Sequence, residues 1–343
     1  MRTSVTDTVR RIILASISVV LTLVVAEVGL RLVGWGTVTP EMGFGMNTRS
    51  ALEQGRFLPD ADLFWKLPLR ANEVDRTIKA VHPDLPPPPR RAAQRILVLG
   101  DSCSRLSMGV LPYSALLEQR LAGQGYEVLN ASVPGYTTYQ GLAWLHTQLL
   151  DLEPDLVVVY FGWNDHWRAT GRTDRQYAAS RSASRLRLLS LLWRAPEKPP
   201  VRVPVDQFAD NLDAIIATCA ERDIGVLVIA APHHLTREAA QHLVQTRYIL
   251  PGENPTLMHR EYLEITADRA RQGGAALLAA DRLFAKVGSL GPLLMRDGIH
   301  LTDAGHQVMA AALASVITTG VGADGSLPAS LVEAVTPHVP ATD

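Results

Sequence analysis

Beyond Arg95 the chain alternates between short apolar runs and longer segments with one apolar face. The run "LVVVYF" is rich in β-branched residues, which favours a buried strand, whereas the leucines of "YSALLEQRL" recur at helical spacing. Strands are predicted at 96–99, 126–129, 156–161, 225–230 and 275–278, and helices at 112–121, 139–150, 206–222, 256–271 and 302–317. Strands that alternate with helices form a parallel sheet covered on both faces. The expected fold class is therefore α/β.

The first 34 residues carry a different pattern. Three arginines precede "IILASISVVLTLVVA", which contains no charge. A helix over residues 12–33 would span roughly 33 Å, enough to cross a bilayer. We predict an uncleaved transmembrane helix, because apolar residues resume after Glu27. Cationic residues ahead of it predict a cytoplasmic N-terminus and an extracytoplasmic remainder. A signal peptide cleaved after Ala26 is the alternative.

Composition narrows the function classes. The 343 residues carry a formal net charge of −1, so the chain lacks the basic footprint that favours nucleic acid as a partner. The two cysteines, Cys103 and Cys219, are far apart and are expected to be free thiols. Cysteine and histidine spacings typical of a metal site are missing, so no metal is expected.

Residues 35–94 show weak periodicity and include "HPDLPPPPRR" at 82–91. Consecutive prolines favour a stiff, extended chain, which predicts a spacer between membrane and domain. We divide the chain into a cytoplasmic tip and anchor at 1–34, a membrane-proximal segment and Pro-rich linker at 35–94, a main domain at 95–319 with an insertion at 166–204, and a C-terminal tail at 320–343.

Polar loops that contain glycine follow three of the predicted strands, and a fourth precedes the last helix. They read "GDSCS" at 100–104, "NASVPGYTTYQG" at 130–141, "GWNDHW" at 162–167 and "RDGIHLTDAGH" at 296–306. In a parallel sheet the site lies at the carboxyl ends of the strands. We therefore expect these loops to converge.

Two neighbouring residues in the first loop, Ser102 and Cys103, are potential nucleophiles. Acyl transfer from an ester needs a nucleophile, a base, a group that orients the base, and donors for the oxyanion. Asp297 precedes His300 by three residues, so a tight turn can set its carboxylate against Nδ1 and leave Nε2 for the nucleophile. A serine at a strand-to-helix turn also has a free backbone N–H.

With these residues the sequence resembles the SGNH hydrolases, also called the GDSL family. The four blocks of that family fall here, in the same order, on Ser102, Gly135, Asn164, and Asp297 with His300. The resemblance implies a flavodoxin-like three-layer sandwich with a five-stranded parallel sheet, and no metal or organic cofactor. It implies Ser102 as nucleophile, His300 as base and Asp297 as the group that orients it. The implied oxyanion hole consists of the N–H groups of Ser102 and Gly135 and the side chain of Asn164. The apolar N-terminus is similar to the membrane-anchored bacterial branch.

Some of these residues also fit other roles. Ser102 also suits a helix N-cap, and Cys103 is expected to point into packing behind the turn. His306 also has an aspartate three residues before it, Asp303, but we expect His306 near the surface of the last helix and Asp303 to cap that helix. The amphipathic stretch "SRLRLLSLLWR" at 184–194 is either a helix packed on the domain or a lid over the site.

These observations predict a membrane-anchored, extracytoplasmic serine ester hydrolase that cleaves acyl esters through an acyl-enzyme. Its substrate would be an acylated glycan, a lipid or a small ester. It would bind the membrane through the N-terminal helix and would not bind nucleic acid. An O-acyltransferase that acts on cell-envelope glycans with the same residues is the alternative. A non-catalytic binding protein on this fold is the third hypothesis.

Overall fold

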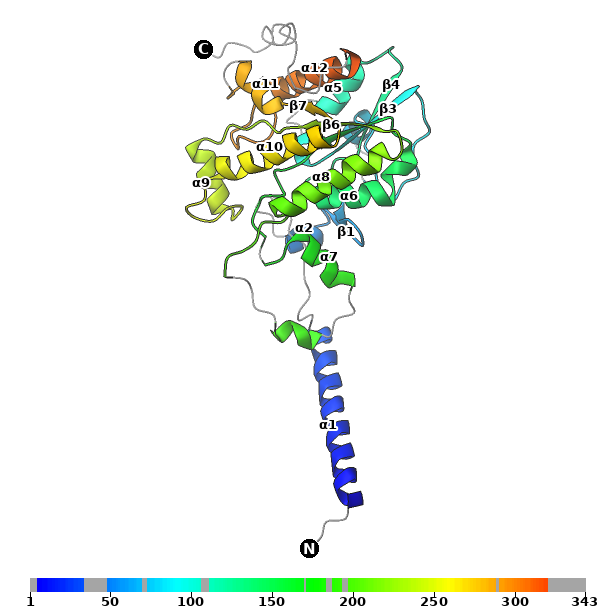
Figure 1. The fold of residues 1–343 in the computed structure, drawn as a ribbon, viewed down its shortest axis with the longest axis vertical. Helices are drawn as coiled ribbons and strands as arrows, with labels where there is room; N and C mark the ends of the chain where they lie inside the picture. Colours follow the sequence, from blue (N-terminus) through cyan, green and yellow to red (C-terminus); the bar gives the residue numbers. More distant parts are fainter. Residues whose placement is uncertain are drawn as a thin grey trace.

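Five parallel strands form the centre of the protein, in the order β4-β3-β5-β6-β7 (Figure 1). The computed structural model describes residues 5–33, 48–69, 73–105, 111–169, 171–182, 187–192, 197–287 and 290–319. The strands are β3 (Gln94–Gly100), β4 (Tyr126–Asn130), β5 (Leu156–Tyr160), β6 (Gly225–Ile229) and β7 (Ala276–Leu278). When these five strands are numbered 1 to 5 along the chain, their order across the sheet is 2-1-3-4-5, which is the flavodoxin-like arrangement. The predicted α/β fold is confirmed.

Helices cover both faces of the sheet. Alternate residues of β3 point to opposite sides, so Ile96 and Val98 belong to one core cluster and Leu97 and Leu99 to the other. The first face packs against α5 (Tyr113–Arg120), α11 (Ala280–Lys286) and α12 (Asp303–Thr319), and the second against α6 (Thr138–Thr147), α8 (Val205–Ala220) and α10 (Pro255–Gln272). Helices α9 (Arg237–Gln245) and α11 were not predicted. They contain nine and seven residues, which is too short for a clear helical pattern of apolar positions.

The segment before the sheet packs against the domain. It contains α2 (Thr48–Glu53), the antiparallel pair β1 (Leu58–Asp60) and β2 (Phe64–Lys66), and α3 (Glu73–Thr77). Phe57, Phe64 and Trp65 are buried in the second core cluster, and Ala80 bridges to Asn130 at the end of β4. The aromatic residues of this segment therefore dock on the domain, because burying their side chains is favourable.

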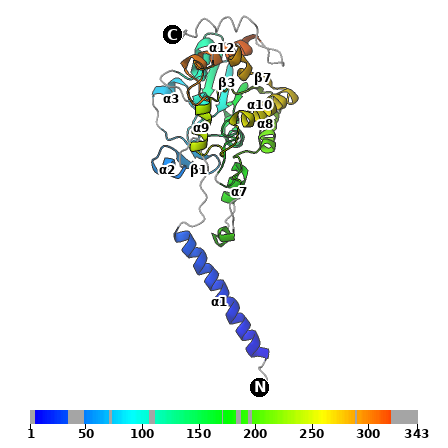
Figure 2. The ribbon, with the colours of Figure 1, turned by 90° about the vertical axis from the view of Figure 1, so that its left-hand side faces the viewer.

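Helix α1 (Val5–Leu32) leaves the domain as a single rod (Figures 1 and 2). Within Asp7–Leu32 the most apolar window of 18 residues has a mean hydropathy of 2.4, so the helix is long and apolar enough to cross a membrane. Glu27 pairs with Arg31 at 2.7 Å, as their spacing allows. Glu27 also accepts a hydrogen bond from the backbone N–H of Leu188 at 3.0 Å. The end of α1 therefore contacts the predicted insertion.

Two described elements lie in that insertion, α7 (Asp174–Ser182) and the 3₁₀ helix η2 (Arg187–Leu192). Residues 170, 183–186 and 193–196, including Trp193, lie outside the described residues. Part of the amphipathic stretch 184–194, for which a helix packed on the domain and a lid are the two expectations, therefore falls outside them too, and its described part is 3₁₀ rather than α-helical.

Candidate active site

Side chains from the first and last polar loops meet at the carboxyl end of the sheet. Ser102 opens α4 (Ser102–Arg105) directly after β3, and its Oγ lies 3.0 Å from Nε2 of His300, which is 198 residues away in sequence. Nδ1 of His300 lies 2.7 Å from Oδ2 of Asp297. The structure thus brings together the serine, histidine and aspartate that the sequence motifs singled out.

The other oxygen of Asp297 holds the turn that carries His300. Oδ1 accepts the backbone N–H groups of Ile299 at 2.9 Å and His300 at 3.0 Å. Burial acts to raise the pKa of Asp297, but the hydrogen bond and charge of His300 and the two N–H donors lower it below its usual value. The ionised carboxylate favours a proton on Nδ1, which leaves the Nε2 lone pair for the Ser102 hydroxyl.

Gly298 lets this turn lie directly against the loop after β6. Its φ is +72°, and a Cβ there would lie 2.1 Å from the carbonyl oxygen of His234. We expect Gly298→Ala to lower kcat/KM at least tenfold and stability by about 2–4 kcal/mol, because the clash with backbone must displace the turn. Ester hydrolysis and thermal unfolding measure the two effects. Gly274→Ala is the matched control, since Gly274 has the same φ and open space around it. Equal effects in both variants would refute the importance of the close contact.

Cys103 does not share the environment of Ser102. Its Sγ lies 3.9 Å from the carbonyl oxygen of Ile299, and the side chain is fully buried. Burial raises the pKa of the Cys103 thiol well above its usual value, so it stays protonated at neutral pH. Its predicted place in the packing behind the turn is confirmed.

The loop after β4 contains a tight turn beside β3. Tyr136 N–H donates to the Val133 carbonyl at 3.1 Å, Pro134 follows Val133, and Gly135 has φ +83°, features typical of a type II turn. Val133 N–H donates to the Gly100 carbonyl at 3.1 Å. Among the described residues, no acceptor is found for the N–H of Gly135 or of Ser102. Both groups can therefore donate to a ligand.

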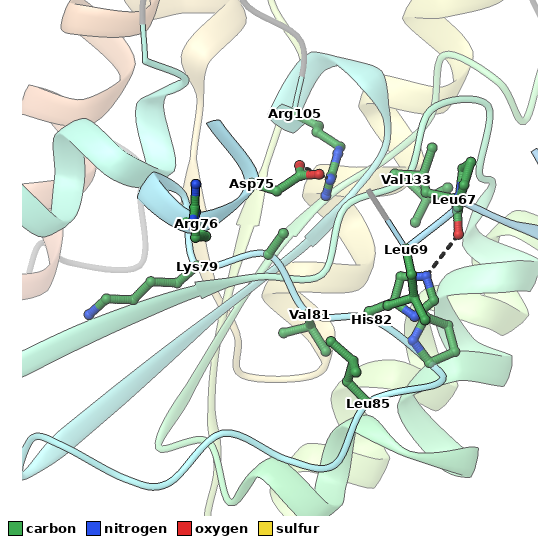
Figure 3. Close-up of a pocket in the computed structure, with 13 residues that line it drawn as sticks. Leu67, Leu69, Asp75, Arg76, Lys79, Val81, His82, Leu85, Arg105 and Val133 are labelled. Atoms are coloured by element: carbon green, nitrogen blue, oxygen red, sulfur yellow. Dashed lines mark hydrogen bonds and ion pairs between the residues drawn. The ribbon is translucent and has the colours of Figure 1, made fainter. Parts of the chain in front are cut away.

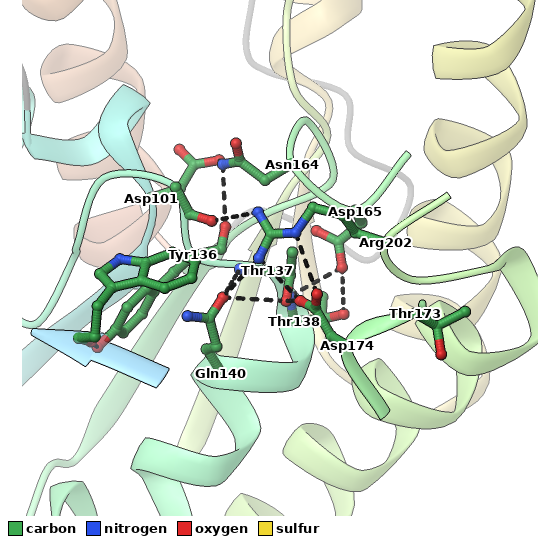
Figure 4. Close-up of polar contacts among 12 residues, drawn as sticks. Asp101, Tyr136, Thr137, Thr138, Gln140, Asn164, Asp165, Thr173, Asp174 and Arg202 are labelled. Atoms are coloured by element: carbon green, nitrogen blue, oxygen red, sulfur yellow. Dashed lines mark hydrogen bonds and ion pairs between the residues drawn. The ribbon is translucent and has the colours of Figure 1, made fainter. Parts of the chain in front are cut away.

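Asn164 joins this turn to the loop after β3, but its amide is already engaged. Nδ2 donates to Oδ2 of Asp101 at 2.9 Å and to the Tyr136 carbonyl at 3.0 Å (Figure 4). Asp101 also accepts the backbone N–H of Cys103, and burial raises its pKa to about 6. The sequence singled out Asn164 as a donor, but nothing in it indicated that both amide hydrogens have protein acceptors.

Two acidic residues brace the surrounding loops. Asp165 accepts the N–H and hydroxyl of Thr138 and the N–H of Gly162, so it joins the start of α6 to the loop after β5. Asp174 of α7 pairs with Arg202, which is buried and extends toward the Tyr136 and Gln140 region (Figure 4). Neither Arg202 nor Asp174 belongs to a motif, so neither could be found from the sequence.

The expectation that His306 lies near the surface is wrong. Its side chain is fully buried between α12 and α5, where Nδ1 accepts the Tyr113 backbone N–H at 3.2 Å. The predicted cap is also corrected, because Thr302 Oγ1 accepts the Gly305 N–H while Asp303 is exposed. His306 therefore has a structural place away from Ser102.

His166 and His259 form a second buried pair, with Nε2 of His166 3.2 Å from Nδ1 of His259. Burial lowers the pKa of His166 to about 3, so the ring is neutral. Within the described residues, no group of three or more histidine, cysteine, aspartate or glutamate side chains is placed to hold a metal ion.

A pocket of about 200 Å³ is lined by residues 67–69, 75–76, 79–83 and 85, together with Arg105 and Val133 (Figure 3). Leu67, Leu69, Leu85 and Val133 give it a largely apolar lining, and Arg105, paired with Asp75, lies at one side. Its volume is below the roughly 300–1,000 Å³ of pockets for drug-sized ligands, so only a small group fits.

Comparison with known proteins identifies the family. The model of the GDSL-like lipase/acylhydrolase family matches residues 98–308. The chain belongs to this family. Esterase TesA of Pseudomonas aeruginosa is 40% identical over 135 residues, which span 37% of this chain and 67% of that protein. An arylesterase of Vibrio mimicus is 44% identical over 86 residues, which span 23% of this chain and 41% of that protein.

Solved structures of GDSL hydrolases resemble this one more distantly. The lipase/acylhydrolase from Enterococcus faecalis aligns with a TM-score of 0.48 at 19% identity, over 68% of this chain and all of that one. The TesA structure aligns with a TM-score of 0.44 at 22% identity, over 66% of this chain and all of that one. As a GDSL-family protein, the chain is a carboxylic ester hydrolase. The matched residues contain Ser102, Gly135, Asn164, Asp297 and His300.

Proposed function

We propose that the protein is a membrane-anchored serine ester hydrolase that works through an acyl-enzyme at Ser102. The observation that carries the proposal is the continuous chain of hydrogen bonds from Asp297 through His300 to Ser102, at 2.7 and 3.0 Å. A nucleophile, a base and a group that orients the base are the parts that acyl transfer requires.

In the proposed reaction Ser102 Oγ attacks the ester carbonyl and its proton moves to Nε2 of His300. The tetrahedral intermediate collapses, the C–O bond to the alcohol breaks, and the alcohol leaves with that proton. His300 then takes a proton from water, which attacks the acyl-enzyme, and returns it to Ser102 as the carboxylic acid departs. Asp297 holds the imidazole and stabilises its charged form.

Backbone donors would stabilise the oxyanion. The N–H groups of Ser102 and Gly135 have no acceptor among the described residues, which supports their assignment to this role. Asn164 would join them by releasing one of its two present acceptors when substrate binds, since hydrogen bonds in free enzymes often rearrange in the complex.

The N-terminal helix supports the proposed location. Asp7–Leu32 has the length and hydropathy of a membrane span, and Arg10 and Arg11 lie near its N-terminal end. Cationic residues on that side favour a cytoplasmic N-terminus, which would put the catalytic domain in the periplasm or at the cell surface.

The direct test is hydrolysis of p-nitrophenyl esters of increasing acyl length and of acetylated glycans by washed membranes that contain the full chain. We expect hydrolysis that sediments with the membranes and is lost in Ser102→Ala. An excess of acyl transfer to an acceptor glycan over hydrolysis would replace the hydrolase with an O-acyltransferase. Absence of any Ser102-dependent turnover, together with no labelling by a fluorophosphonate, would refute both.

A further inference from the structure

The turn that carries the Gly135 N–H is held at two successive carbonyls. The Pro134 carbonyl accepts a hydrogen bond from Nε1 of Trp65 at 3.3 Å. The Gly135 carbonyl accepts one from Nη1 of Arg202 at 2.6 Å. Two side chains from distant parts of the chain therefore determine how this turn is oriented.

The first of these hydrogen bonds acts on the peptide group that contains the Gly135 N–H. The Pro134 carbonyl and the Gly135 N–H belong to one peptide, and no cis peptide bond occurs in the described chain. In a planar trans peptide the C=O and N–H point in opposite directions, so anchoring the carbonyl on Trp65 sets the direction of the N–H. A hydrogen bond to the carbonyl also polarises the amide and strengthens its N–H as a donor.

Trp65 is itself rigidly placed. Its side chain is fully buried, and its own carbonyl accepts the Tyr136 hydroxyl at 2.6 Å. The indole packs edge-on against the Tyr136 ring at 5.8 Å, and the Arg202 guanidinium lies 5.5 Å from its centroid. Trp65 lies in β2, outside residues 98–308 that match the family model.

Arg202 is fixed by the residues around it. Its guanidinium donates to both carboxylate oxygens of Asp174, at 3.2 and 2.9 Å, and to Gln140 at 3.0 Å (Figure 4). Both charged side chains are buried, with exposed fractions of 1% and 3%. The planar guanidinium can reach these acceptors and the Gly135 carbonyl together, which a single ammonium cannot.

We propose that Trp65 is a positioning residue for the Gly135 N–H, with Arg202 as the second anchor of the same turn. The segment before the family domain is then part of the catalytic unit rather than a tether. The proposal rests on the proposed function, in which Gly135 donates to the oxyanion.

Trp65→Phe tests this proposal, because phenylalanine keeps an aromatic side chain and removes the indole N–H. We expect kcat for a p-nitrophenyl ester to fall about five- to tenfold with KM unchanged. The inhibition constant of a trifluoromethyl ketone, whose adduct with Ser102 carries an oxyanion, should rise by the same factor. Trp144→Phe is the matched control: Trp144 is equally buried, but its Nε1 donates to Gln148 at 3.0 Å. Trp144→Phe should lose comparable thermal stability but keep the kcat and the inhibition constant of the unchanged protein.

Identical kcat and inhibitor affinity in Trp65→Phe and Trp144→Phe would overturn the positioning role. Turnover that persists in Ser102→Ala would instead overturn the proposed function, so the two failures are distinguishable.

If Trp65→Phe does not fold, Arg202→Lys tests the second anchor of the turn, at the Gly135 carbonyl. Lysine keeps a cation beside Asp174 but cannot also bind Gly135, so kcat should fall with KM unchanged. Normal kcat in a folded Arg202→Lys protein would overturn the proposal equally.

Discussion

Replacing Ser102 with alanine is expected to lower kcat/KM for ester hydrolysis by at least about 10⁴-fold. The substitution removes only the hydroxyl group, whose oxygen lies 3.0 Å from Nε2 of His300. The fold should be unaffected, because the side chain is small and the Asp297–His300 hydrogen bond remains. Steady-state hydrolysis of a p-nitrophenyl ester and fluorophosphonate labelling measure the loss.

Cys103→Ala is the natural control, since it alters the neighbouring potential nucleophile. We expect it to retain most activity, within about threefold, because the thiol is buried, protonated and directed toward Ile299. Loss of activity in Cys103→Ala, with retention in Ser102→Ala, would reverse the assignment of the nucleophile.

Asp297→Asn is expected to lower kcat about 10³–10⁴-fold. An asparagine oxygen can still accept the N–H groups of Ile299 and His300, but then its NH₂ faces Nδ1. That NH₂ favours an unprotonated Nδ1, which places the proton on Nε2 and removes the acceptor for Ser102. Loss of the carboxylate charge also destabilises the imidazolium. The change should appear in kcat with little change in thermal stability.

Asp303→Asn is the matched control, because Asp303 also lies three residues before a histidine. Its side chain is exposed on α12, and Nδ1 of the buried His306 already accepts the Tyr113 N–H. We expect unchanged kinetics. A rate loss in Asp303→Asn as large as that in Asp297→Asn would show that His300 and His306 had been assigned the wrong way round.

The strands that carry the site could be predicted from the local pattern of apolar residues. Strand β5 is an unbroken run of one leucine, three valines and a tyrosine, and residues 96–99 of β3 are apolar on both faces, as in a sheet covered on two sides. Both lie within two residues of the predicted bounds. Loops that follow parallel strands share one edge, so the grouping of Ser102, Gly135 and Asn164 could be predicted without coordinates.

Features that depend on long-range packing could not be predicted in this way. Trp65 lies in a segment of weak periodicity, and its burial depends on Tyr136 and Arg202 from distant parts of the chain. His306 is on a helix whose partner face is α5, almost 200 residues earlier, so neither its burial nor its bond to Tyr113 is visible in local spacing. The two acceptors of the Asn164 amide likewise come from separate loops.

The sequence by itself determined the parallel α/β sheet, the apolar N-terminal helix and the residues of the four motifs, because hydrophobic period and motif spacing are local properties. Only the tertiary structure decided that Ser102 rather than Cys103 lies beside His300, and that residues 57–69 and 73–80 dock on the domain. It also decided which side chains hold the Gly135 turn. Each of these depends on the direction of a side chain or carbonyl relative to groups far away in sequence, which packing and burial set once the chain has folded.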